Sequence, residues 1–348
     1  MKRFFRLFLA TLAIAACLFS LAGCSQGATT TLDGAYFLNN SANVGIIANV
    51  NEVNTYDVTF TPSTANVSQV TVSLVEKDGF NTYVTTLKNA EYEGTACYLL
   101  ETALKTNIAY TLGGNDVGTF EDYSVSKVYF LSVSDKLKPL YSETSASAHS
   151  PVRNDNGKYE ILELKYSYSI VYGESEAVVD FKSEKGEFDI KEGKRTYEKY
   201  NKSTYYFDNA TMLFMPRAIS LTDASSLSFS AIDALAGTNR SMTMTSYSSK
   251  PSENIIYSET SEESGVINAT YYINGYKNFR DEETGNQVIP CKVVNFAVSG
   301  TFSGTPIKCW YADTSVSKAR ARLIKMETSA PYALGTFTYV IKNTAVSD

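Results

Sequence analysis

The sequence contains one histidine and one tryptophan in 348 residues. A Ser-His-Asp triad needs a histidine held between a nucleophile and a carboxylate, but His149 lies in a polar stretch beside Pro151 and the chain has no Gly-x-Ser-x-Gly motif. We therefore predict that His149 is a solvated loop residue. Zinc sites use several histidines and cysteines at short spacings, so the sequence predicts no metal site, no cofactor and no catalytic residue.

Cysteine is also scarce, with five residues, of which Cys17 and Cys24 lie near the N-terminus. The other three are Cys97, Cys291 and Cys309, an odd number that rules out a complete disulfide framework. Cys291 and Cys309 would face each other if a hairpin turned at Gly300, and would miss each other if it turned at 302–304. The alternative is that they are buried free thiols, which act as small apolar residues.

The chain has no excess of basic residues, with 31 Lys and Arg against 37 Asp and Glu. Proteins that bind nucleic acid need a basic surface, so no nucleic-acid partner is predicted. Peripheral binding to anionic lipid headgroups needs basic clusters as well. The acidic balance argues against both.

Long helical runs of Leu, Ala, Glu and Lys are absent, whereas the chain has 25 Tyr and 18 Phe. Aromatic and β-branched residues favour pleated, half-buried surfaces. Because 44% of the residues are hydrophobic, the chain has enough apolar material for a large core. The composition therefore indicates a globular protein built mainly of strands.

The N-terminus has the features of an export signal. Basic residues Lys2, Arg3 and Arg6 precede an apolar run from Leu7 to Leu21, which ends in Leu21-Ala22-Gly23-Cys24. The run is about 15 residues long, shorter than the roughly 20 of a membrane-spanning helix. The last four residues resemble the lipobox of bacterial lipoproteins, which implies cleavage after Gly23 and lipidation of Cys24.

This resemblance sets the expected organisation and location. It implies a lipoprotein signal peptide (1–23), and the small polar residues that follow indicate a flexible tether (24–34). A β-rich domain (35–345) would follow, either undivided or in two sub-parts that meet near 142–158. Cleavage of the leader removes three basic residues. The mature chain then has 28 Lys and Arg against 37 Asp and Glu, a net charge of −9. We expect an extracytoplasmic protein held at the cell membrane by its lipid anchor.

Turn signals predict mostly antiparallel pairing of consecutive strands. Asp78-Gly79 separates two alternating runs, and Gly113-Gly114 and Asn274-Gly275 separate others. Such dipeptides between alternating segments are strong hairpin signals. We predict hairpins at each of them.

One strand is especially clear, because apolar and polar residues alternate from 162 to 172. Its apolar face carries three tyrosines, Tyr166, Tyr168 and Tyr172, as expected for a sheet with one buried and one wet face. Residues 337–341 form a similar closing strand. Asp208 is suited to cap a short helix that ends near Pro216.

The segment Ser142–Lys158 is polar, contains Pro151 and Gly157, and lacks periodicity. It is interpreted as a domain boundary or a long loop. The fold prediction is all-β and mainly antiparallel, a large curved sheet, half-barrel or sandwich, with one or two short helices.

The C-terminal part carries a recognisable order of motifs. DNATMLFMPRAISL (208–221) precedes the strand VIPCKVVNF (288–296), and Cys309–Asp313, Arg322–Glu327 and Gly335 follow. This order resembles an uncharacterised, domain-of-unknown-function family of exported bacterial β-proteins, and more distantly the LolA- and LolB-type lipoprotein carriers. The resemblance covers roughly residues 205–345 and implies a curved half-barrel with short helices over its concave side.

Three functions remain open at this point. The first is non-enzymatic binding of an apolar ligand or lipid on the concave face, with aromatic candidates Tyr166, Tyr168, Tyr172, Trp310 and Tyr311. The second is a surface or scaffold module that binds an envelope protein or a glycan. The third is a hydrolase that uses paired carboxylates, for which Glu262, Glu263 and 281–283 are candidates, although their polar surroundings predict solvated charges.

Overall fold

The computed structural model describes residues 51–63, 69–133, 136–154, 156–186, 188, 190, 192–198, 205–235, 237–249, 255–257, 287–289, 291–298, 306–313, 321–330 and 333–346. The signal peptide, the tether with Cys24, the Asn274-Gly275 turn and the acidic clusters at 262–263 and 281–283 lie outside these residues. Within the described part, no helix is long and apolar enough to cross a membrane.

The chain is all-β and mainly antiparallel, as the composition predicts. The strands are β1 (Asn51–Pro62), β2 (Val70–Leu74), β3 (Thr82–Tyr92), β4 (Thr95–Leu112), β5 (Asn115–Val133), β6 (Lys136–Arg153), β7 (Tyr159–Tyr172), β8 (Glu176–Lys185), β9 (Gly193–Glu198), β10 (Tyr205–Phe207), β11 (Ser226–Asp233), β12 (Thr238–Ser248), β13 (Ile255–Tyr257), β14 (Gln287–Ile289), β15 (Cys291–Val298), β16 (Pro306–Ala312), β17 (Leu323–Ser329) and β18 (Gly335–Val346). Helix α3 (Asn209–Met212) and the 3-10 turn η2 (Met215–Ala218) lie between β10 and β11.

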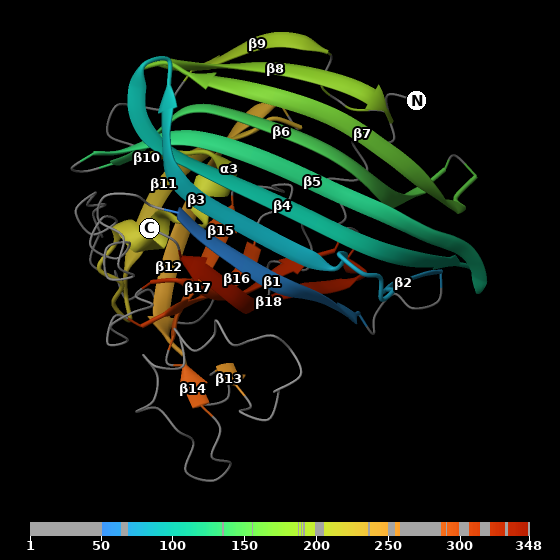
Figure 1. The fold of residues 1–348 in the computed structure, drawn as a ribbon. Coiled ribbons are helices and arrows are strands. Elements are labelled where there is room, and N and C mark those ends of the chain that lie inside the picture. The colour runs from blue at the N-terminus through green and yellow to red at the C-terminus, as the bar shows by residue number, and fades with distance from the viewer. Residues whose placement is uncertain are drawn as a thin grey trace.

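Sixteen strands form one large open sheet, and β13 and β14 pair separately. The order in the large sheet is β10-β11-β12-β15-β16-β17-β18-β1-β3-β4-β5-β6-β7-β8-β9, with β2 paired to β4. Among the described strands every pair is antiparallel except β10–β11. In Figure 1, β3–β9 form a broad curved surface in front of α3, and β10–β12 and β15–β17 lie behind it.

The predicted hairpin at Asp78-Gly79 is wrong. Strand β2 pairs with the distal half of β4, and β3 pairs with the proximal half. The 18 residues of β4 are enough for β2 and β3 to lie end to end along it. The turn therefore links two successive partners of one long strand, although Gly79 does adopt a positive φ of 73°.

The predicted turn at Gly113-Gly114 is confirmed, since it joins β4 to β5 with φ values of 56° and 82°. In contrast, most of the segment 142–158 is strand rather than loop. Strand β6 runs through to Arg153 and pairs with β7 from Tyr141 to Arg153.

Helix α3 and η2 fill one end of the curved sheet. The predicted cap is confirmed, because the Asp208 carboxylate accepts a hydrogen bond from the Ala210 N–H at 2.9 Å. Register aligns a row of buried side chains across this end of β3–β8: Leu87, Leu100, Val128, Ser142, Ile170 and Val179. The first three belong to the main core, and Ile170 and Val179 belong to a neighbouring apolar cluster. Because α3 packs against β4 and β5, this end has no room on its concave side.

The two ends of the sheet approach each other without strand pairing. Side chains from β7 and β8 form an apolar cluster with Ile232 and Ala234. Asn239 accepts a hydrogen bond from the Tyr206 hydroxyl at 3.1 Å and donates one to the Glu198 carbonyl at 2.7 Å. These contacts close the curved sheet into a barrel-like body.

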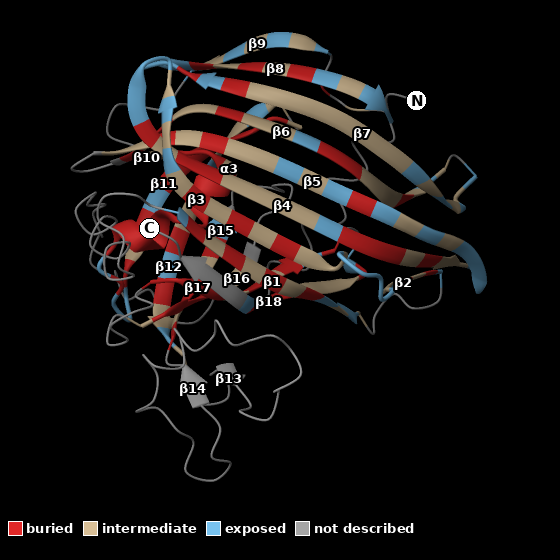
Figure 2. Ribbon diagram, in the orientation of Figure 1, coloured by how far each residue is buried: buried red, intermediate tan, exposed pale blue. Residues whose placement is uncertain are grey.

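A second apolar cluster lies at the far ends of the long strands. Its buried members are Val70, Val72, Ile108, Tyr110, Ala330 and Leu334. The inner face of β4–β7 therefore has a packed core at each end. Between the two cores most side chains are half-buried (Figure 2), although Thr106, Asp122 and Ala146 are buried.

Candidate functional site

The residues between the two cores form a half-buried surface on the inner face of β4–β7, which we call the inner belt. It consists of Thr102, Leu104, Ser124, Ser126, Thr144, Leu164, Tyr166 and Tyr168. Strand β7 has intermediate exposure over most of its length (Figure 2). Small side chains on β5 and β6 leave this part of the concave face less filled than either end.

A row of polar side chains crosses the inner belt from strand to strand. Register places Asn54, Thr85, Thr102, Ser126, Thr144 and Tyr168 side by side on β1, β3, β4, β5, β6 and β7. The Ser126 and Thr144 hydroxyls lie 2.8 Å apart, and a side-chain hydrogen bond joins Thr144 to Tyr168. The inner face is thus amphipathic at this point, with a line of hydroxyls between apolar rows.

Aromatic rings border the belt on β7 and β8. The rings of Tyr166 and Tyr168 are nearly parallel at 5°, with centroids 6.4 Å apart. Phe188 packs edge-on against Tyr166 at 5.3 Å and against Phe181 at 5.2 Å. Burial and the charge of Asp233 raise the pKa of Tyr166 to about 12, so its hydroxyl stays protonated in neutral solution.

Tyr172, the third tyrosine of this face, supports the fold. It is buried, and its hydroxyl donates to Asp208 Oδ2 at 2.7 Å. Burial raises the pKa of the Asp208 carboxyl, and the hydrogen bonds from Tyr172 and Ala210 only partly oppose this shift. Tyr172 therefore holds the helix cap in place, while Tyr166 and Tyr168 keep part of their surface exposed.

A buried ion cluster lies at the opposite end of the hydroxyl row. Glu52 accepts hydrogen bonds from Arg217 at 2.6 and 3.0 Å and from Arg322 at 3.1 Å. Asn54 donates to the same carboxylate at 2.6 Å. Burial alone would raise the pKa of Glu52, but the two guanidinium charges and these hydrogen bonds lower it from 4.5 to about 2.

The other two predicted aromatic residues, Trp310 and Tyr311, point to opposite faces of β16. Tyr311 is fully buried in the core and donates to the Leu213 carbonyl at 2.9 Å. Trp310 is 3% exposed and lies between the ammonium groups of Lys308 and Lys325, which are 4.8 and 4.3 Å from its ring centroid. The structure therefore does not bring these two residues together with the tyrosines of β7.

The prediction of a solvated loop histidine is wrong. His149 lies in β6 with a side chain that is 17% exposed, and its ring stacks on Phe120 at 4.5 Å. Asp122 Oδ1 accepts from the His149 backbone N–H at 3.0 Å and lies 2.7 Å from Nδ1. The Tyr110 hydroxyl donates to the His149 carbonyl at 2.7 Å. These contacts hold the end of β6 against β4 and β5.

The three described cysteines are free and buried. Cys291 pairs in register with Ala312, and Cys309 pairs with Val294, so the two thiols do not face each other and the free-thiol alternative is confirmed. Burial raises the pKa of both thiols, which keeps them protonated.

Three buried carboxylates, Glu52, Asp122 and Asp233, were not predicted from the sequence, whereas Asp208 was predicted as a helix cap. Asp233 lies 3.7 Å from the Arg240 Nε, and the other three have the partners described above. A general acid needs a carboxyl that can exchange its proton with a substrate. These carboxylates instead hold neighbouring elements in place. Within the described part of the chain, no three His, Cys, Asp or Glu residues are grouped so that they could hold a metal ion.

No known family model matches the sequence, and no curated protein matches it. Among solved structures, the chain is similar to a beta-barrel-like protein of a domain of unknown function (DUF1849) from Brucella abortus, with 9% identity and a TM-score of 0.44. The match covers 86% of this chain and 98% of that one. At this level of similarity the functional argument depends on the residues of this chain alone.

Proposed function

We propose that this protein is a membrane-anchored, extracytoplasmic, non-enzymatic binding module that holds an amphipathic lipid on its inner belt. The observation that carries the proposal is the half-buried band of hydroxyl and aromatic side chains between two packed cores. Residues in a strand alternate between faces, so this band belongs to the concave side.

The apolar part of the ligand would contact four side chains, Leu104, Leu164, Tyr166 and Tyr168. All four are half-buried, so covering them removes apolar surface from water. Each square ångström of apolar surface covered contributes about 25 cal/mol. An acyl chain fits this description, because it buries area without needing hydrogen-bond partners.

The polar part of the ligand would meet the hydroxyl row. Serine and threonine hydroxyls both donate and accept hydrogen bonds, and Ser126 and Thr144 are half-buried next to the aromatic rings. Hydroxyls, leucines and protonated tyrosines bind ligands but exchange no protons near neutral pH. This composition favours holding over catalysis.

The proposed anchor is the lipidated Cys24. Two or more acyl chains hold a protein stably at a membrane, whereas one chain does not. A protein that is fixed in this way would act as an acceptor or holder within reach of the membrane rather than as a diffusing carrier.

The proposal is tested with Cys24→Ser protein purified without detergent. We expect mass spectrometry of an organic extract to find co-purified lipid, and a fluorescent palmitic-acid probe to bind saturably. Ser126→Phe places a ring in the belt and should weaken probe binding at least about tenfold, a loss of about 1.4 kcal/mol. The matched control is Val125→Phe, which changes the neighbouring residue on the outer face. This variant should bind the probe as tightly as the Cys24→Ser protein does.

Two results would contradict the proposal. One is an extract free of lipid together with no saturable binding of the probe. The other is equal binding by the Ser126→Phe and Val125→Phe variants, both checked for an unchanged circular dichroism spectrum.

A further inference from the structure

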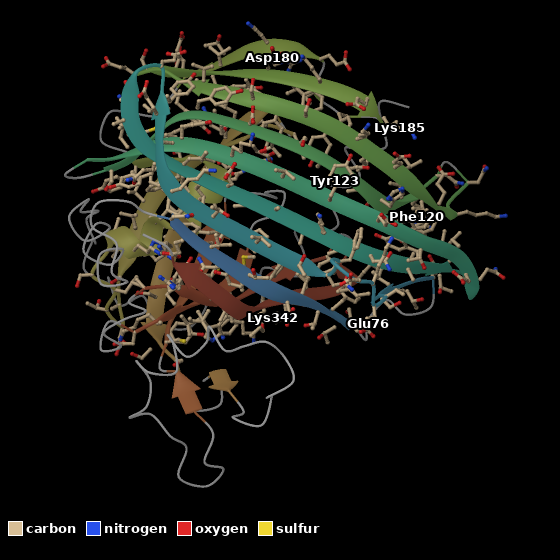
Figure 3. All side chains as sticks on the ribbon, viewed as in Figure 1. Glu76, Phe120, Tyr123, Asp180, Lys185 and Lys342 are labelled. Carbon is tan, nitrogen blue, oxygen red and sulfur yellow. The ribbon has the colours of Figure 1, made fainter. Side chains whose placement is uncertain are left out.

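The outer face of β5–β8 carries a second recess, on the other side of the sheet from most of the inner belt. Its lining shares two residues with the belt, Thr144 and Tyr168. It is an open trough of about 310 Å³, lined by Val125, Lys127, Tyr141, Glu143, Thr144, Ser145, Ser167, Tyr168, Ser169, Asp180 and Lys182. This volume is at the lower end of the range of small-molecule sites. Figure 3 marks the two flanking strands by Tyr123 on β5 and Asp180 on β8.

The trough exists because short side chains lie between long ones. Register aligns Lys127, Glu143, Ser169 and Asp180 in one row, and Val125, Ser145, Ser167 and Lys182 in the next. Three serines on β6 and β7 thus form the floor. Longer side chains on β5 and β8 form the two walls, and they carry both donors and acceptors.

The charges of the lining balance. Lys127 and Lys182 are matched by Glu143 and Asp180, and the Lys127 ammonium lies 3.0 Å from Glu143 Oε1. A lining without net charge does not select an anion or a cation. Its polar floor also disfavours an acyl chain, because covering hydroxyls with apolar groups costs free energy.

One end of the trough is formed by an aromatic ring held in a fixed orientation. The Tyr141 ring stacks on Tyr92 at 5.4 Å and 10°, and Tyr129 packs on Tyr92 at 5.4 Å. The Tyr141 hydroxyl donates to Glu143 Oε2 at 3.3 Å. A ring that is already ordered loses little entropy when a ligand stacks on it.

A peptide has no strand edge to join here. Strands β5, β6, β7 and β8 are each paired on both sides, so their backbone groups already take part in ladder hydrogen bonds. Strand addition needs a free edge. Recognition in the trough must therefore use side chains alone.

We propose that this outer trough binds a neutral oligosaccharide. Sugars present hydroxyls that pair with serine, carboxylate and ammonium groups, and flat C–H faces that stack on an aromatic ring. The lining offers both in one recess: the serine floor with mixed charges, and the ordered Tyr141 ring. The protein would then hold a lipid on one face and a glycan on the other.

The test measures binding of cellohexaose, maltohexaose and chitohexaose to the Cys24→Ser protein by calorimetry. We expect saturable binding of at least one of them, with a Kd below about 1 mM. Ser167→Phe fills the floor and Tyr141→Ala removes the ring, so each should weaken binding at least about tenfold. Ser126→Phe is the control, because it blocks the inner face and should leave sugar binding unchanged.

Three outcomes would overturn the proposal. They are no binding of any of the three sugars, equal binding by the wild-type and Ser167→Phe proteins, and tighter binding of anionic hexagalacturonate than of the neutral sugars. Retention of the palmitic-acid probe by Ser167→Phe shows that this variant is folded. It also separates failure of the trough from failure of the inner belt.

Discussion

Glu52 joins three parts of the chain that are far apart in sequence. Its carboxylate binds Arg217, 165 residues away, and Arg322, 270 residues away. All three side chains are at most 4% exposed, so water does not screen their interaction. A buried charge that loses its partner costs far more than an exposed one. Glu52 is therefore the residue at which η2 and the start of β17 are fixed to β1.

Replacement of Glu52 should be severe. Glu52→Ala leaves two buried guanidinium groups without their carboxylate, and we expect a loss of about 3–5 kcal/mol of unfolding free energy in urea titrations. The control is Asp57→Asn, which breaks the exposed pair with Lys342 and should cost no more than about 1 kcal/mol. Similar losses in the two variants would refute the role given to Glu52.

The pH dependence of stability should carry the signature of Glu52. The pKa of its carboxyl is about 2 in the folded protein and 4.5 as its ordinary value. The folded state therefore gains stability above pH 4.5, and this gain disappears as the pH falls toward 2. The contribution amounts to about 3 kcal/mol. Urea titrations from pH 6 to pH 2 should show this loss in the wild type and a flatter profile in Glu52→Gln.

Asp208 should act in the opposite direction. Burial raises the pKa of its carboxyl above 3.8, so stability decreases as the pH rises through 3.8 toward the folded value. Asp208→Asn keeps the cap without the charge and should change stability by less than about 1 kcal/mol, whereas Asp208→Ala loses the cap and should cost about 2 kcal/mol. Equal thermal shifts in both variants would contradict this view of the cap.

At the scale of elements, strands with a clear alternation were predictable and strands without one were not. The alternation of β7 comes from large inner residues and polar outer ones, as the sequence indicates. The part of β6 from Ser142 onward was interpreted as a domain boundary or a long loop, because its inner positions include Ser142, Thr144 and Ala146, which are small or polar. Those same small residues keep the inner belt half-buried. The alternation of apolar and polar residues that identifies a strand is therefore absent from the part of β6 where the candidate site lies.

Loss of the contact between the two ends of the sheet should loosen only the strands at those ends. Asn239→Ala removes the hydrogen bonds to Tyr206 and to the Glu198 carbonyl. We expect a loss of about 1–2 kcal/mol and faster amide exchange in β9–β11. Hydrogen-exchange mass spectrometry should find β3–β5 unchanged, because their ladders do not involve this contact. Uniformly faster exchange over the whole sheet would argue against local closure.

At the scale of the whole molecule, the curved sheet was implied only by the resemblance of the C-terminal motifs, whereas composition was enough to predict the all-β class. It was not enough for the pairing of β2 or for the Glu52 cluster, because both depend on residues brought together across the whole fold. Local turn signals describe a few residues at a time. The length of β4, which accommodates two partners, is a property of the assembled sheet.

Anchoring is a property of the whole molecule that can be tested in cells. The wild-type protein should incorporate labelled palmitate and partition into the membrane fraction. Cys24→Ser should lose both properties, because it lacks the thiol that would be acylated. Cys17→Ser changes a cysteine inside the leader and should behave as the wild type does. Incorporation of labelled palmitate into the Cys24→Ser protein would contradict the predicted lipidation of Cys24.

Methyl NMR with a spin-labelled fatty acid shows on which face of the sheet an acyl chain binds, and we expect the inner belt. Spin-labelled stearic acid should broaden the methyl signals of Leu104 and Leu164, which belong to the belt. Broadening should be weaker for Val125 and Val171, which are 37% and 47% exposed on the outer face. Broadening of the valines that equals or exceeds that of the leucines, or no broadening at all, would show that the acyl chain does not bind in the inner belt.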